Sequence, residues 1–166
     1  AKMHVDQQQQ EPIPWEEVRK YQKILRNATS RVKFLQEKRG LTMETIERFH
    51  LGYDGERFII PILDHTGNVV NLRRYDPNSK GSDKVKNKPG RGMMRVFPWE
   101  NLIKNTILLV GGELDAIIST QLGFNGVSST NGEMSWSASW DRLFSGKIVW
   151  ICYDNDETGR KGSLKV

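Results

Sequence analysis

Apolar runs that alternate with helical patterns constrain the fold of this chain more than any other feature. TILLV at 106–110 and KIVWICY at 147–153 are predominantly apolar, and each precedes a helical pattern, ELDAIISTQLG or ETGRKGSLKV. Between them lie a shorter strand, GVSST, and a predicted helix at 135–144. Continuous apolar strands alternating with helices indicate a parallel sheet with helices on both faces. We therefore predict an α/β unit over 105–166.

The preceding part, 14–104, has the pattern of an α+β unit. Apolar residues spaced by three and four predict a helix from Pro14 to Gly40, and Thr42 is the expected N-cap of a second helix. RFIIPIL and VVNLRRY predict a β-hairpin, and MMRVF a further strand. Residues 76–92 are expected to form a long loop. Residues 1–13, which are Gln-rich, are expected to form a tail or linker.

Charge is divided unevenly between the two parts. Residues 1–104 contain 20 Lys and Arg against 13 Asp and Glu, whereas residues 105–166 contain 5 against 7. The segment from Arg73 to Arg95 alone has 8 basic residues and 2 acidic ones. A basic part that holds phosphates beside an acidic part that holds a cation suits an enzyme acting on a polyanion. The alternative is a solvated basic surface without a ligand.

Several classes of protein are excluded by composition. The single cysteine, Cys152, allows neither an internal disulfide nor a Cys-rich zinc site, and its place in an apolar strand predicts a buried, inert thiol. Tryptophans such as Trp150 are expected in the core. No apolar stretch approaches the ~20 residues that span a bilayer, and no signal segment begins the chain. A cytoplasmic protein is therefore expected.

Acidic residues follow two of the predicted parallel strands. GGELD occupies 111–115, and Asp154 and Asp156 form a D-x-D sequence after the last strand. Strand ends meet at the carboxyl edge of such a sheet, and paired carboxylates there favour Mg²⁺ or Mn²⁺. Gly111, Gly112 and Gly159 are expected to let the backbone approach a phosphate or other ligand. The alternative is that the two aspartates only cap the final helix.

These motifs resemble a known family. ILLVGGELDAIISTQLGF and LFSGKIVWICYDNDETGRKG resemble a Toprim domain, and FLQEKRGLTMETIERFHLGYDGERFIIPILDHTGNVVNLRRY resembles the basic N-terminal subdomain of bacterial-type and phage primases. The resemblance covers about 20–166. It implies a basic α+β subdomain followed by an α/β Toprim domain that is truncated at its C-terminus.

The resemblance also implies an activity, the synthesis of RNA primers on single-stranded DNA from NTPs. Glu113, Asp154 and Asp156 would be catalytic and would bind Mg²⁺ or Mn²⁺. The expected partners are the template, NTPs and a replicative helicase, fused or recruited, in bacterial, phage or mobile-element replication. The residues implied in binding nucleic acid or nucleotide are Arg73, Arg74, Lys84, Lys86, Lys88 and Arg91.

One departure from the family pattern leaves the function open. The family has its first catalytic acid where this chain has Gly111, so either Glu113 substitutes or the carboxylate is missing. If it is missing, Gly111→Glu is expected to strengthen Mn²⁺ binding. The alternative functions are a catalytically silent, nucleic-acid-binding Toprim module of a larger replication protein and a Toprim nuclease.

Overall fold

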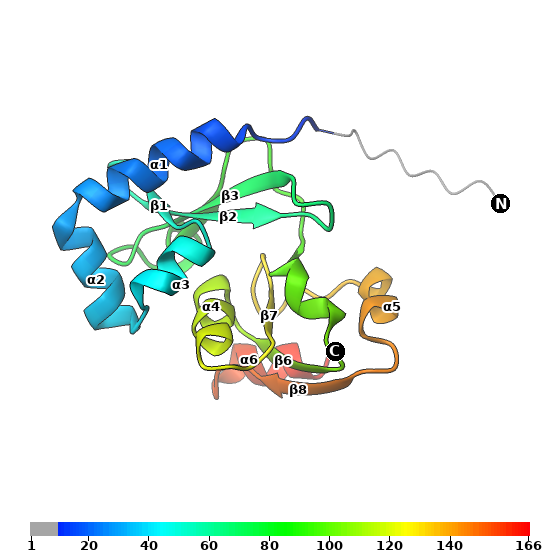
Figure 1. Ribbon diagram of the computed structural model, residues 1–166. Coiled ribbons are helices and arrows are strands. Elements are labelled where there is room, and N and C mark those ends of the chain that lie inside the picture. The colour runs from blue at the N-terminus through cyan, green and yellow to red at the C-terminus, as the bar shows by residue number, and fades with distance from the viewer. Residues whose placement is uncertain (1–9) are drawn as a thin grey trace.

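The computed structural model describes residues 10–166, which form two four-stranded sheets with helices around them (Figure 1). The first sheet is antiparallel, in the order β1-β2-β3-β4, and the second has the order β5-β7-β6-β8. The strands are β1 (Gly52–Tyr53), β2 (Phe58–Leu63), β3 (Val69–Tyr75), β4 (Val85–Asn87), β5 (Val96–Phe97), β6 (Thr106–Val110), β7 (Gly126–Ser129) and β8 (Ile148–Cys152). The helices are α1 (Trp15–Asn27), α2 (Thr29–Arg39), α3 (Met43–Arg48), α4 (Glu113–Gln121), α5 (Asp141–Phe144) and α6 (Glu157–Ser163).

The long N-terminal helix predicted from the sequence is in fact two helices. Ala28 has φ −97° and ψ 73°, outside the helical region, and separates α1 from α2. The break allows Leu25 and Leu35, on different helices, to pack into the same core. Gly40 ends α2 in the left-handed conformation, as predicted, and the Thr42 hydroxyl accepts a hydrogen bond from the Thr45 amide at the start of α3.

The predicted hairpin is confirmed. Strands β2 and β3 pair from Phe58 opposite Tyr75 to Leu63 opposite Val69. Asp64 closes the turn, because its Oδ1 accepts hydrogen bonds from the amides of Thr66 and Asn68 at 2.9 and 3.0 Å. The turn is therefore fixed by local side-chain chemistry.

Two segments differ from the sequence prediction in the first sheet. The expected loop 76–92 contains β4, which extends the sheet beside β3. The strand has only three residues, and the surrounding Lys and Gly residues are typical of a loop, so the sequence did not indicate it. The expected tail 1–13 lies outside the described residues up to position 9. Ile13, however, pairs with Val69 and is 97% buried, so the chain already joins the core there.

The second sheet carries the predicted parallel arrangement, with β7 and β8 on either side of β6. Alternate residues of β6 face opposite layers: Val110 belongs to the core under α4, whereas Ile107 and Leu109 belong to a separate cluster with Phe144. Both faces of the sheet are therefore covered at β6. The predicted helix 135–144 is reduced to a 3₁₀ turn, Ala138–Trp140, and the short α5.

The edges of this sheet correct three expectations. β5 pairs antiparallel with β7, so a segment assigned to the first unit by sequence belongs to the second sheet. β8 is the opposite edge, where Trp150 is 65% exposed and Cys152 is also exposed. Neither side chain is buried as predicted, because both lie on the face that α4 covers, and α4 packs mainly on β7 and β6. An apolar sequence does not distinguish an edge strand from a central one.

The two units share an apolar core. Ala116 and Ile117 of α4 belong to the same cluster as Leu35 and Phe58. The Gln121 side chain connects the units by accepting from the Thr42 amide and donating to the Gly40 carbonyl, both at 2.8 Å. The helices described between residues 10 and 166 include none that is long and apolar enough to cross a membrane.

Candidate functional site

The carboxyl ends of the three parallel strands bring four acidic side chains to one edge of the second sheet. Val110 on β6 lies level with Ser128 on β7 and Cys152 on β8, so the loops after these strands are neighbours. Asp115 lies in the first turn of α4, and Asp154 and Asp156 follow β8, as predicted. Glu133, in the loop after β7, is the fourth. Strand ends of this kind are where open α/β sheets hold ligands.

The two aspartates of the D-x-D sequence have different surroundings. Asp156 is the N-cap of α6, and its Oδ1 accepts a hydrogen bond from the Gly159 amide at 2.8 Å. Asp154 is exposed. The pKa of Asp115 is raised mainly by the burial of Asp115 itself and next by the negative charge of Asp154. Gly159 is needed for packing, since a Cβ there would overlap the carbonyl oxygen of Asp154. The Gly159 amide, which was expected to face an anion, instead donates to the capping side chain of Asp156.

Oxygen donors of these aspartates are of the type that Mg²⁺ prefers. Among residues 10–166, however, no three His, Cys, Asp or Glu side chains lie close enough together to hold a metal ion. Asp154 and Asp156 fit a cation that keeps several water ligands, as Mg²⁺ commonly does. The carboxylate oxygens are therefore of the ligand type that Mg²⁺ prefers, but the described side chains do not provide a complete set of ligands.

Glu113 lies elsewhere than the sequence analysis placed it. Its Oε1 accepts a hydrogen bond from Nε of Arg73 at 2.5 Å, and the two side chains expose only 7% and 8% of their surfaces. Arg73 also donates to Asn87 at 2.7 Å. Glu113, expected at the metal, and Arg73, expected at nucleic acid, are thus bound to each other in the interior. Their ion pair leaves neither side chain available to a metal or to nucleic acid.

Glu133 is an acidic residue that the sequence analysis missed. Its Oε1 accepts a hydrogen bond from the Asp154 amide at 2.7 Å, and a Cβ added to Gly111 would lie 2.7 Å from the same oxygen. The space beside Gly111, where the sequence suggested that a carboxylate could be added, is therefore already filled by a carboxylate. The position of Glu133 after the second parallel strand, at the same edge as the aspartates, was the sequence feature that could have identified it. Gly112 has more room, with the Asp115 carboxylate 3.4 Å from a Cβ added there.

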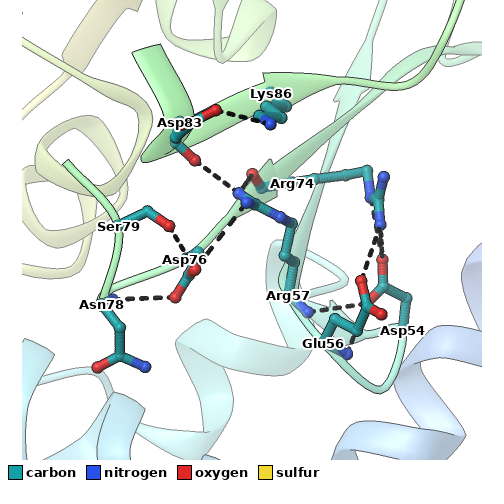
Figure 2. Close-up of polar contacts among 9 residues, drawn as sticks. All are labelled: Asp54, Glu56, Arg57, Arg74, Asp76, Asn78, Ser79, Asp83 and Lys86. Atoms are coloured by element: carbon teal, nitrogen blue, oxygen red, sulfur yellow. Dashed lines mark hydrogen bonds and ion pairs between the residues drawn. The ribbon is translucent and has the colours of Figure 1, made fainter. Parts of the chain in front are cut away.

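Several basic residues of the 73–95 segment are paired with acids. Arg74 pairs with Asp54 at 2.9 Å and Lys86 pairs with Asp83 at 2.7 Å, and both contacts are drawn in Figure 2. Arg57, just before β2, donates to the carbonyl of Asp83 at 2.7 Å, and this bond, drawn in the same figure, holds the 3₁₀ turn that precedes β4. Lys88 pairs with Glu17 at 2.7 Å. These contacts reduce the positive charge that the sequence alone assigns to the segment.

Lys84 and Arg91 lie near opposite ends of β3. The Lys84 carbonyl accepts from the amide of Asp76, just past the strand, and the charges of Arg39 and Lys84 oppose the rise in the pKa of Asp115. Arg91 lines a cavity of about 730 Å³ beside the hairpin turn, together with Arg95. The charge of Lys84 therefore acts on the acidic edge, whereas Arg91 lies beside the hairpin turn at the other end of β3.

Comparison with known proteins gives matches among solved structures. No family model and no curated protein matches the chain. The E. coli primase catalytic core is 24% identical, with a TM-score of 0.73 over 90% of this chain and 64% of that one. A DnaG primase catalytic domain solved with single-stranded DNA is 25% identical, with a TM-score of 0.73, covering 90% of this chain and 62% of that one.

A phage structure also matches. The primase fragment of the bacteriophage T7 primase-helicase is 21% identical, with a TM-score of 0.59 over 76% of this chain and 56% of that one. The chain spans less than two thirds of the length of each of these structures. It nevertheless matches them over 76% to 90% of its own length, and therefore has the fold of part of the bacterial and phage primase catalytic core.

Proposed function

We propose that this chain is the front part of a Toprim-type primase core that synthesises short RNA primers on single-stranded DNA. The observation that carries the proposal is the match over 90% of the chain to a DnaG catalytic domain solved with single-stranded DNA. The position of Lys84 near Asp115 supports it, because a phosphate-binding surface then adjoins a cation-binding edge.

The roles follow from the chemistry of the residues. Asp154 and Asp156 would hold Mg²⁺, which neutralises triphosphate charge and lowers the pKa of the attacking 3′-hydroxyl. That hydroxyl attacks the α-phosphate of the incoming NTP, a new P–O bond forms, and pyrophosphate leaves. Lys84 and Arg91 would hold phosphates of the template or nucleotide. Arg74, Lys86 and Lys88 would also do so, once a phosphate replaces the acidic side chain that each now contacts.

The proposed partners are the DNA template, NTPs and a replicative helicase in bacterial, phage or mobile-element replication. The matched T7 structure belongs to a primase-helicase protein, which supports a helicase that is fused or recruited. Primer synthesis by the full-length protein, with labelled NTPs on single-stranded DNA and Mg²⁺, tests the activity. Absence of any NTP-dependent product, with Mn²⁺ as well, would contradict it.

A catalytically silent, nucleic-acid-binding module is a second candidate. It is favoured by Gly111 and by the lack of a three-residue metal cluster within residues 10–166. Such a module would bind single-stranded DNA but make no primer. A nuclease would instead cut the template in the presence of Mg²⁺. The same reaction, analysed for both primer and template length, distinguishes the three functions.

Binding of single-stranded DNA is expected to depend on Lys84 and Arg91. Replacing both with Ala should reduce the slope of log affinity against log salt by about 1.4, because each lost phosphate contact on a single strand contributes about 0.7. The slope is measured by fluorescence anisotropy over a range of NaCl concentrations.

The matched control is Lys20→Ala/Lys23→Ala, which removes two exposed charges from α1. Figure 1 shows α1 on the side of the first sheet that faces away from the second sheet. The control should leave the slope unchanged. Equal slopes for the two double variants would contradict the proposed binding surface.

A further inference from the structure

Gly111, the first residue after β6 at the acidic edge, has no side chain, and the side chain of Glu133 fills the space beside it. A Cβ on Gly111 would lie 2.7 Å from Oε1 of Glu133 and 3.3 Å from its Cγ and Cδ. The carboxyl group of Glu133 therefore rests directly against the Gly111 backbone. Any side chain at residue 111 would have to displace it.

Glu133 is held in this place by two other elements. The Asp154 amide donates a hydrogen bond to its Oε1 at 2.7 Å, which joins the loop after β7 to the loop after β8. Helix α6 packs against its main chain so closely that a Cβ on Gly162 would overlap the Glu133 carbonyl. Gly132, with φ 83°, gives the chain the left-handed turn that precedes it. The carboxylate is thus positioned by β6, β8 and α6 together.

The charge of Glu133 has no basic partner in the described part of the chain, where none of the ion pairs includes it. Its carboxylate is half-buried and lies against the Asp154 amide, at the edge of the sheet where Asp115 and Asp156 also lie. A half-buried carboxylate among aspartates is unfavourable unless a cation joins them. Its hydrogen bond also leaves Oε2 without a protein donor among the hydrogen bonds described.

We propose that Glu133 supplies, from the loop after β7, the carboxylate that β6 lacks at residue 111, and that it binds the divalent cation together with Asp154. The inference rests on the proposed function, since that function requires a cation at this edge. It assigns the missing acid to a residue 22 positions away in the sequence and removes Glu113 from that role.

Moving the carboxylate back to β6 provides a direct test. Glu133→Gln keeps an oxygen that accepts from the Asp154 amide but removes the charge. Gly111→Glu/Glu133→Ala removes the carboxylate from the loop and restores one on β6, in the space that Glu133 vacates. Glu37→Gln, an exposed acid on α2, is the control for a change of one charge. Mn²⁺ binding is measured by calorimetry, and thermal unfolding in EDTA confirms that each variant is folded.

Glu133→Gln and Glu133→Ala are each expected to weaken Mn²⁺ binding by at least about 100-fold, because the 10- to 100-fold range is typical of groups that only surround and orient a metal. The double variant should return to within a few-fold of wild type. Gly111→Glu alone should bind more weakly than wild type, since two carboxylates would compete for one space. Wild-type affinity in Glu133→Gln, or no recovery in a folded double variant, would overturn the assignment.

Primer synthesis separates this inference from the proposed function. If the full-length wild-type protein makes primers and Glu133→Gln has an unchanged Mg²⁺ requirement, only the role of Glu133 is contradicted. If Mn²⁺ binding follows the expected pattern but no primer is made under any condition, only the proposed activity is contradicted. A wild-type chain that binds no Mn²⁺ would contradict the cation site and the inference together.

Discussion

Replacing Arg73 with Met is expected to lower the free energy of unfolding by about 3 to 5 kcal/mol at pH 7. The guanidinium of Arg73 and the carboxylate of Glu113 are joined at 2.5 Å, and both side chains are more than 90% buried. Removing one partner leaves an unpaired charge in the interior, which costs more than the pair itself contributes. Urea denaturation at pH 7 measures the loss.

The double variant Arg73→Met/Glu113→Leu is the control that identifies the cause. Replacing both partners with apolar side chains is often neutral or stabilising, so most of the loss should be recovered. Asn87 retains a partner, since it still accepts from Asn71 at 2.8 Å. Arg26→Met, which breaks the exposed pair with Glu47, should have a much smaller effect. A double variant as unstable as Arg73→Met would point to lost packing instead of an unpaired charge.

The loss in Arg73→Met should also depend on pH. Burial raises the pKa of Glu113 above its ordinary value of 4.5, and Arg73 opposes this rise. Without Arg73 the folded-state pKa rises further, so the folded protein keeps a proton that the unfolded chain releases above about 4.5. Stability is then lost as the pH increases from that value through the raised pKa. The difference from wild type should therefore be smaller at pH 5 than at pH 7, and equal differences at both would be inconsistent with this explanation.

The sequence predicted the elements that are encoded by local patterns. The 58–75 hairpin follows from alternation and from the turn chemistry of Asp64, and the parallel strands follow from continuous apolar runs. Strand β4 was missed because a strand of three residues, Val85–Asn87, is too short to show a pattern of alternation. The exposure of Trp150 was missed because a strand at the edge of a sheet can be as apolar as one at its centre.

The site was predicted less completely, since its decisive contacts join residues far apart in sequence. Arg73 and Glu113 are 40 residues apart, and each alone has the composition of a surface residue. Glu133 reaches Gly111 only because parallel pairing brings the loops after β6 and β7 to one edge. Motif spacing identifies the edge of the sheet where acids gather. It does not identify which acid fills the space next to a glycine.

Asp156→Asn is expected to weaken Mn²⁺ binding by at least about 100-fold, more than the loss typical of groups outside the metal's own ligands, while thermal stability stays unchanged. Asp156 has two candidate roles, as a cation ligand and as the N-cap of α6, where it accepts from the Gly159 amide at 2.8 Å. Asn caps a helix about as well as Asp, so the substitution removes the charge and keeps the cap. Calorimetric Mn²⁺ titration and thermal unfolding in EDTA measure the two roles separately.

Two further variants complete this separation. Asp156→Ala should lose Mn²⁺ binding and also about 1 kcal/mol of stability, because both the charge and the cap are removed. Thr42→Ala removes the cap of α3, which accepts from the Thr45 amide at 3.2 Å, and should lower stability without affecting Mn²⁺. If Asp156→Asn binds Mn²⁺ as tightly as wild type, Asp156 serves only as a cap. The cation would then depend on Asp154 and Glu133, which approach each other from β8 and β7 across the end of β6.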